Sequence, residues 1–229
     1  MKLEGCYTAL VTPFEGGKVC SSALHDLVEV QIAGGVAGVV PVGTTGESPT
    51  LSMAEHNMVI NQVIDSVDGR CKVIAGTGGN STAEAGELTE HARGAGADAT
   101  LQVSPYYNKP TQEGLYRHFS TVADIGLPVV LYNIPGRCNI EISIDTVKRL
   151  AAHPNIVAVK EAGGDADRVS KTLRACDITV VSGDDALTLP MMVLGATGVI
   201  SVASNVVPAE VTELTTRALA GDFVGALEV

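Results

Sequence analysis

Eight short runs rich in small and β-branched apolar residues alternate along the chain with segments of helical length. The runs are CYTALV (6–11), GVVPV (38–42), KVIAG (72–76), ATLQV (99–103), PVVLYN (128–133), IVAVK (156–160), ITVVS (178–182) and GVISV (198–202). Short apolar runs bounded by turn signals are typical of strands buried on both faces of a parallel sheet. Eight strand–helix units in one chain predict a closed (β/α)8 barrel (a TIM barrel), a single α/β domain covering residues 1–229.

An open doubly wound sheet is the competing architecture, but it usually has fewer strands and a glycine-rich phosphate turn. Neither GxGxxG nor GxxxxGK[ST] occurs in the sequence. Two candidate capping boxes, at Ser52–Glu55 and Ser81–Glu84, mark the starts of two helices. Thr111 and Ser143 are candidate N-caps of two others. The eighth helix is expected to begin near Pro208, and we expect no extra C-terminal helices after it.

Charge and cysteine content narrow the possible partners and compartments. The net charge of −11 argues against nucleic acid or an anionic membrane as a partner, because binding there needs clustered Lys and Arg. The N-terminus lacks the apolar core of a signal peptide, and no apolar run reaches membrane-spanning length. The five cysteines are scattered and odd in number, which indicates reduced thiols rather than disulfides or a zinc site. These features predict a cytoplasmic protein.

The chemically distinctive residues follow the predicted strands. They are GTTGES (43–48), SPYYNKP (104–110), LYNIPGR (131–137), Lys160 and SGDD (182–185). The carboxyl ends of barrel strands open onto one end of the barrel, where the active sites of such enzymes lie. Strand alternation places Ala158 with Lys160 on one face and Val130 with Tyr132 on one face. If these faces point inward, Lys160 and Tyr132 meet above the barrel core, with Arg137 at the rim.

A lysine in that position has an available chemistry. An apolar setting and a nearby cation such as Arg137 both lower the pKa of an amine and free it as a nucleophile. The amine of Lys160 can then form a Schiff base with a ketone, while the phenol of Tyr132 carries protons. Backbone N–H groups and hydroxyls of Gly43, Thr44 and Thr45 can hold a small carboxylate.

The motifs GTTGES, SPYYNKPTQEGLY, LYNIPGR, IVAVKEA and SGDD, in this order and spacing, resemble the 4-hydroxy-tetrahydrodipicolinate synthase (dihydrodipicolinate synthase) family. These are pyruvate-dependent class I aldolases on (β/α)8 barrels. The resemblance implies that Lys160 forms a Schiff base with pyruvate, without metal or other cofactor. The enamine then attacks L-aspartate 4-semialdehyde, in lysine and diaminopimelate biosynthesis. It also implies a proton relay of Tyr132, Thr44 and Tyr107, the last supplied by a neighbouring subunit of a homodimer or homotetramer.

The resemblance assigns further residues to binding. It implies that Arg137 holds the semialdehyde carboxylate, that Thr45 contacts the pyruvate carboxylate, and that Gly183 and Ile200 line the pocket. Many members are inhibited by lysine, at positions matched here by Ser48, His56, Asn80, Glu84 and Tyr106. Met53 stands where inhibited members often carry His, and Cys138-Asn139 replaces the usual Thr-Gly after the arginine. The first departure bears on inhibition by lysine, and the second on the loop at the site entrance.

The same residues are compatible with three other interpretations. The family continues past the barrel with a C-terminal helical segment that this sequence is expected to lack, so a truncated, weakly active or inactive member is one alternative. N-acetylneuraminate lyase and 2-keto-3-deoxy-sugar-acid aldolases share the lysine and tyrosine but generally lack an equivalent of Arg137. A non-catalytic barrel that binds pyruvate or an amino acid is another.

A metal-dependent aldolase or hydrolase needs ligands at the barrel mouth. Asp184 and Asp185 precede a predicted helix and are expected to cap it. The histidines fall in or beside helical patterns, at positions His25, His56, His91, His118 and His153. The sequence therefore predicts no metal site.

Overall fold

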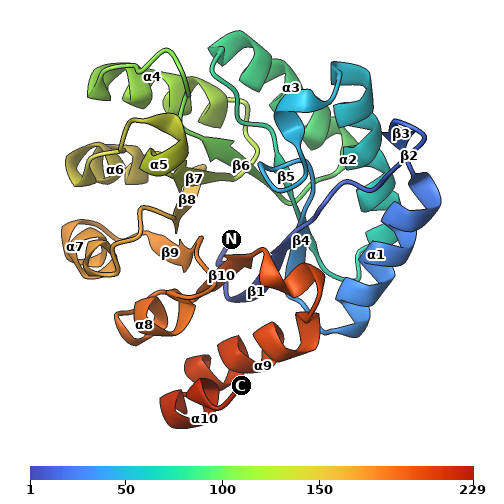
Figure 1. The fold of residues 1–229 in the computed structure, drawn as a ribbon. Coiled ribbons are helices and arrows are strands. Elements are labelled where there is room, and N and C mark those ends of the chain that lie inside the picture. Colours follow the sequence, from blue (N-terminus) through green and yellow to red (C-terminus); the bar gives the residue numbers. More distant parts are fainter.

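The computed structural model describes residues 1–229 and contains the predicted barrel. Eight parallel strands close in the order β1-β10-β9-β8-β7-β6-β5-β4 (Figure 1). Their bounds are β1 (Gly5–Ala9), β4 (Gly38–Val40), β5 (Lys72–Gly76), β6 (Ala99–Val103), β7 (Val129–Asn133), β8 (Ile156–Glu161), β9 (Thr179–Ser182) and β10 (Gly198–Ser201). Each predicted run overlaps one of these strands, so the predicted (β/α)8 fold is confirmed.

Eight helices surround the strands, one after each strand (Figure 1). They are α1 (Ser21–Ala33), α2 (Met53–Val67), α3 (Thr82–Ala95), α4 (Gln112–Ala123), α6 (Ile144–Ala151), α7 (Asp167–Ala175), α8 (Thr188–Val193) and α9 (Pro208–Leu219). None of the helices is both long enough and apolar enough to cross a membrane.

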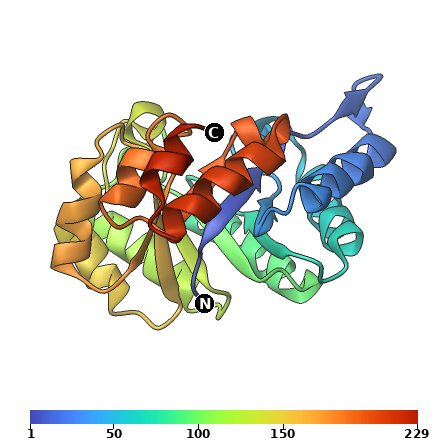
Figure 2. The ribbon, with the colours of Figure 1, turned by 90° about the horizontal axis from the view of Figure 1, so that it is seen from below.

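Several short elements were not predicted from the sequence. They are the hairpin β2 (Phe14–Glu15) and β3 (Lys18–Val19), the one-turn helix α5 (Pro135–Cys138), the 3-10 turns η1 (Ser48–Thr50) and η2 (Ala203–Asn205), and α10 (Phe223–Leu227). One of them, α10, follows the eighth barrel helix, so the expectation that no further helix comes after it is wrong. Helix α10 packs against α9, which lies over β1, as Figure 2 shows. It begins where the Asp222 side chain accepts a hydrogen bond from the Gly225 N–H at 2.9 Å.

The predicted helix caps form, with one difference. Ser52 accepts a hydrogen bond from the Glu55 N–H at 3.3 Å, and Glu55 accepts one from the Ser52 N–H at 2.9 Å, so α2 begins with a complete capping box. Ser81 accepts only the Glu84 N–H, at 3.4 Å, so the box of α3 is half formed. The remaining caps form on α4 and α6, at Thr111 and Ser143.

The core has an inner and an outer layer, as strand alternation requires. One buried cluster fills the barrel interior and includes Val130, Tyr132, Ala158 and Ile200. Two larger clusters fill the space between the strands and the helices. The predicted inward faces of β7 and β8 are therefore correct, and they bring the last inward residue of each strand to the mouth of the barrel.

Candidate active site

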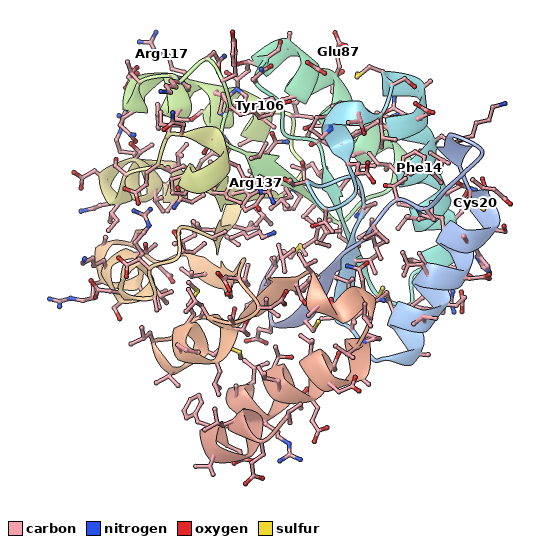
Figure 3. All side chains as sticks on the ribbon, viewed as in Figure 1. Phe14, Cys20, Glu87, Tyr106, Arg117 and Arg137 are labelled. Atoms are coloured by element: carbon pink, nitrogen blue, oxygen red, sulfur yellow. The ribbon has the colours of Figure 1, made fainter.

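The carboxyl ends of β5, β6 and β7, with the loops that follow β4 to β7, line a cavity of about 230 Å³. Three of the predicted site residues, Thr44, Tyr132 and Arg137, line it. In Figure 3 Arg137 lies toward the middle of the ring of strands, and Tyr106 lies farther out beside α3 and α4. The volume suits a ligand of a few heavy atoms and is smaller than the usual site for a large organic ligand.

Lys160 and Tyr132 are neighbours on adjacent strands. The register of β7 and β8 pairs the two residues directly. The Lys160 Nζ lies 4.2 Å from the centroid of the Tyr132 ring, and the two residues are only 4% and 5% exposed. Lys160 is not among the residues that line the cavity, so its amine is almost closed off from solvent beside the phenol ring.

The surroundings of Lys160 change its acidity. Burial is the main cause that lowers its pKa to about 8, and the positive charge of Arg137 acts in the same direction. The negative charge of Asp185 opposes them. At pH 7 about one amine in ten is then neutral, whereas an unperturbed lysine has about one in a few thousand. The predicted effects of burial and Arg137 are present. The effect of Asp185 was missed, and its only sequence signal is the acidic pair after the seventh predicted strand.

Tyr132 remains a phenol at neutral pH. Burial raises the pKa of its hydroxyl to about 12 and outweighs the nearby charge of Arg137, which lowers the pKa. The nearby Thr44 side chain also lowers the pKa of Tyr132 slightly. Tyr132 can thus give a proton to a developing oxyanion and exchange it with Thr44, which is exposed to the cavity.

Gly183 leaves the space that the Lys160 side chain occupies. A Cβ atom at Gly183 would lie 2.8 Å from the Lys160 Cε and 2.7 Å from the Ala162 Cβ. The Gly183 N–H donates to the backbone oxygen of Glu161 at 2.7 Å. Ile200 is fully buried in the inner cluster beneath the mouth. Neither residue lines the cavity itself. Gly183 limits the room around Lys160, and Ile200 belongs to the barrel core.

The GTTGES loop is held against the barrel by backbone contacts. The Thr12 hydroxyl donates to the Gly46 oxygen at 2.7 Å. Gly76 allows close approach of the loop, because a Cβ there would lie 2.5 Å from the Val42 oxygen. Thr44 lines the cavity, but Thr45 does not, although it is partly exposed.

Arg137 and Cys138 lie on the one-turn helix α5, and both line the cavity. Arg137 is exposed, whereas Cys138 is 1% exposed, and burial raises the pKa of its thiol to about 11. Asn139 ends α5 with a left-handed φ of 55°, a conformation that asparagine adopts more readily than most other residues. The Cys138-Asn139 pair is therefore compatible with the turn that carries Arg137.

Tyr107 does not reach the site of its own chain. It is 91% exposed, has a φ of 72°, and does not line the cavity. An aromatic residue in the left-handed region is strained, and such strain persists where a site needs it. Of the three predicted relay residues, the structure brings together Tyr132 and Thr44 only.

Two of the predicted effector residues, Ser48 and Tyr106, line the same cavity as Tyr132. Burial is the main cause that raises the pKa of Tyr106, and the negative charge of Glu84 adds to it. Glu84 is exposed in the first turn of α3. These three residues therefore lie near one another at the edge of the cavity.

The other predicted effector residues make structural contacts. His56 is 3% exposed, and its Nε2 lies 3.0 Å from the backbone oxygen of Gly76. The backbone oxygen of Asn80 accepts a hydrogen bond from the Asn108 side chain at 3.0 Å. Met53 begins α2 and is exposed. His56 in its present conformation supports β5 rather than facing solvent.

The paired aspartates stabilise turns. Asp184 Oδ1 accepts hydrogen bonds from the N–H groups of Ala186 and Leu187 at 3.0 and 3.3 Å, just before α8. Asp185 Oδ2 accepts the Val202 N–H at 3.0 Å and so joins the β9 and β10 loops. The prediction that both cap the following helix is thus wrong. Asp184 holds the turn before α8, whose N-cap position is Leu187, and Asp185 binds a different loop. The histidines lie in or after helices, as predicted, at His25, His56, His91, His118 and His153.

Comparison with known proteins identifies relatives over nearly the whole chain. The Dihydrodipicolinate synthetase family model matches residues 2–229. The 4-hydroxy-tetrahydrodipicolinate synthase of Leptospira biflexa is 51% identical over 223 residues, 96% of this chain and 76% of the relative.

Two crystal structures show the same fold. The dihydrodipicolinate synthase from Aquifex aeolicus has a TM-score of 0.97 and 53% identity, covering 99% of this chain and 78% of that one. The dihydrodipicolinate synthase from Acinetobacter baumannii complexed with pyruvate has a TM-score of 0.96 and 47% identity, covering 98% and 79%. The matched family, the barrel and the sequence identities together show that this chain belongs to the dihydrodipicolinate synthetase family.

Proposed function

We propose that this chain is a lyase that condenses pyruvate with L-aspartate 4-semialdehyde to 4-hydroxy-tetrahydrodipicolinate, through a Schiff base on Lys160. The observation that carries the proposal is the buried amine of Lys160, with its pKa lowered to about 8, beside the phenol of Tyr132. Relatives about half identical in sequence are named for this reaction, which belongs to lysine and diaminopimelate biosynthesis. The pyruvate complex of the Acinetobacter relative supports pyruvate as the first substrate.

In the first step, the neutral Lys160 amine attacks the ketone carbon of pyruvate. The ketone oxygen takes a proton from Tyr132, and a further proton transfer lets it leave as water, which gives an iminium ion. Thr44 returns a proton to Tyr132 from the solvent side. The hydroxyls and N–H groups of Gly43, Thr44 and Thr45 hold the pyruvate carboxylate.

In the second step, the iminium ion loses a proton from the pyruvate methyl group and becomes an enamine. The enamine carbon attacks the aldehyde carbon of the semialdehyde, and the aldehyde oxygen takes a proton to become the 4-hydroxyl group. Arg137 holds the carboxylate of this substrate at the cavity edge, as an exposed guanidinium can. The substrate amino group then displaces Lys160 from the imine carbon, which closes the ring and frees the amine.

We also propose that Tyr107 completes the relay in the cavity of a neighbouring copy, in a homodimer or homotetramer. Its high exposure and its absence from its own cavity support this role. Ser48, His56, Asn80, Glu84 and Tyr106 are proposed as an effector site for lysine. A cytoplasmic location is proposed from the five free cysteines.

Borohydride reduction in the presence of pyruvate tests the Schiff base. We expect peptide mass spectrometry to find a reduced pyruvate adduct on the Lys160 peptide, and none in Lys160→Ala. A coupled assay with aspartate semialdehyde then measures turnover. Labelling on another lysine, or no adduct in folded protein, would contradict the proposal.

The same assay separates the sugar-acid aldolases from the synthase. Because Arg137 lies at the cavity edge, we expect Arg137→Ala to raise the KM for the semialdehyde while the pyruvate adduct still forms. Equal or better turnover with a polyhydroxylated aldehyde would favour an aldolase of the N-acetylneuraminate lyase type.

A further inference from the structure

The residues that follow Tyr132 and Lys160 on their strands are also paired. Asn133 and Glu161 are neighbours in the register of β7 and β8, one step beyond the catalytic pair, Tyr132 and Lys160. Strand alternation directs them to the opposite face of the barrel wall. Asn133 is fully buried and Glu161 is 2% exposed. Each member of the catalytic pair thus has a buried polar residue directly behind it.

The carboxylate of Glu161 is fully hydrogen bonded. Its Oε1 accepts from the Asn133 side chain at 2.9 Å and from the Gly163 N–H at 2.8 Å. Its Oε2 accepts from the Arg168 Nε at 2.9 Å and again from the Asn133 side chain at 3.1 Å. Arg168 lies in the first turn of α7 and is 7% exposed. A buried ion pair is well defined only when such extra hydrogen bonds satisfy it. We call Asn133, Glu161 and Arg168 the buried triad.

The buried triad also binds the rim loop, residues 134–143, which joins β7 to α6 and carries Arg137 on α5. The Asn133 Oδ1 accepts the Ile142 N–H at 3.0 Å, and the Arg168 Nη2 donates to the Ile142 oxygen at 2.7 Å. Both backbone groups of Ile142 are therefore held by the triad. Arg168 Nη1 also pairs with Glu141 at 2.8 Å, at the start of the segment that enters α6.

We propose that the buried triad is a positioning element for catalysis. It fixes the positions of Tyr132 and Lys160 relative to each other along β7 and β8, and it holds the rim loop over the cavity. None of its members lines the cavity, so it acts through the residues that it holds. It joins the strand of Tyr132, the strand of Lys160 and the loop of Arg137 through one carboxylate. This inference rests on the proposed function and deepens it. Small displacements of reacting groups cost large factors in rate, so losing the triad is expected to cost activity beyond any cost in stability.

The double variant Glu161→Leu/Arg168→Met separates position from stability. Replacing a buried ion pair by apolar residues of similar size often preserves stability, whereas removing one partner does not. Arg168→Met alone leaves the Glu161 carboxylate buried without its cation, so it serves as the destabilised reference. Asn133→Ser removes the amide bridge and keeps the ion pair, and it is the second test variant if the double variant does not fold.

The matched control is Gln31→Met. Gln31 is fully buried on α1 and accepts the Thr8 hydroxyl at 2.6 Å. Its removal breaks a buried side-chain hydrogen bond on another part of the barrel wall. Urea unfolding measures the stability of every variant, and kcat and KM are measured under conditions where each is folded.

Acetylation with labelled acetic anhydride over a pH series reports on Lys160 without either substrate. Peptide mass spectrometry gives the reactivity and pKa of its amine in each variant. In the test variants we expect kcat to fall by about tenfold to a hundredfold, with Lys160 acetylation moving toward the profile of an exposed lysine. In Gln31→Met, kcat and the Lys160 acetylation profile should equal those of the unmodified protein.

The outcomes are distinct. Wild-type kcat and a wild-type Lys160 acetylation profile in both Glu161→Leu/Arg168→Met and Asn133→Ser would overturn the positioning role, even if stability fell. A pyruvate adduct that never forms on the unmodified protein would instead overturn the proposed function. In that case the acetylation profiles still decide whether the triad positions the amine.

Discussion

At the scale of the residue, the reactivity of Lys160 is a balance between burial and two charges. Burial and Arg137 favour the neutral amine, and Asp185 favours the ammonium form. The ring of Tyr132, 4.2 Å away, also attracts the ammonium form through its negative face. The net result places the titration of the amine close to physiological pH, where a small change in either charge alters the amount of nucleophile.

We therefore expect the rate of pyruvate adduct formation to rise with pH and to level off above about 8, the pKa of Lys160. The sign follows because the neutral amine is the nucleophile and its share grows as pH rises through the pKa. Quenched-flow borohydride trapping between about pH 6 and pH 10 measures this curve.

Asp185→Asn should displace that curve toward lower pH, because it removes the charge that raises the pKa of Lys160. The asparagine keeps an oxygen that can accept the Val202 N–H, so the β10 loop should stay in place. Arg137→Gln should displace the curve toward higher pH. A shift in the same direction for both variants would contradict this account of the charges.

Gly183→Ala tests the space around Lys160. The new methyl group would lie 2.8 Å from the Lys160 Cε, so the lysine side chain or the strand must move. We expect kcat to fall by about tenfold to a hundredfold and the free energy of unfolding to fall by about 1–3 kcal/mol. Steady-state kinetics and urea unfolding measure the two effects.

The control for this change is Gly94→Ala, in the last turn of α3, where a Cβ meets nothing within 4 Å. It should leave kcat unchanged and raise the free energy of unfolding by about 0.5 kcal/mol or less, because helix propensity counts less at a helix end than in its interior. Normal kcat in Gly183→Ala would show that Lys160 has room that the structure does not indicate.

At the scale of the element, the long strands and helices were predictable, but the short elements in the loops were not. The apolar runs and helix caps mark the eight barrel units, because strand burial and N-terminal capping are local properties. The one-turn helix α5 and the turn η1 have too few residues to show the periodic apolar pattern of a helix. Their backbone is held by distant groups, such as Asn133 for the loop after α5 and Thr12 for the GTTGES loop.

The two N-terminal caps of α2 and α3 offer an element-level prediction. Ser52→Ala should lower the free energy of unfolding by about 1–2 kcal/mol, and Ser81→Ala by about 0.5–1 kcal/mol, because only α2 has the complete capping box. Urea unfolding near pH 7 measures the difference.

The pH dependence of the same two variants provides a check. Hydrogen bonds from Ser52 lower the pKa of Glu55, so their stabilising effect is present above the unfolded pKa and is lost as pH falls through the lowered one. The gap between Ser52→Ala and the unmodified protein should therefore narrow in acid. A larger loss for Ser81→Ala at neutral pH would contradict the assignment of the two caps.

At the scale of the whole molecule, one chain holds most of the proposed site but leaves Tyr107 outside it. The residue is 91% exposed and projects from the loop between β6 and α4. If Tyr107 acts in a neighbouring copy, a chain that lacks Lys160 can still supply its phenol to a chain that lacks Tyr107.

Co-expression of Tyr107→Phe with Lys160→Ala tests this exchange. Each variant alone should have little activity. In a random mixture of symmetric dimers, half of the dimers contain both chains and each of these has one complete site, so about a quarter of the activity should return. No recovery from purified mixed dimers, with mixing shown by native mass spectrometry, would place Tyr107 in its own chain or outside the reaction.

The sequence by itself determined the barrel and the meeting of Lys160 with Tyr132. Both depend on local patterns, the period of two along a strand and the common direction of parallel strands. Only the tertiary structure decided how deeply the amine is buried and that Asp185 acts on it. It also decided that Asn133 and Arg168 both bind the carboxylate of Glu161. These features depend on distances between segments far apart in the chain, and on solvent that the rest of the molecule excludes, so no local pattern encodes them.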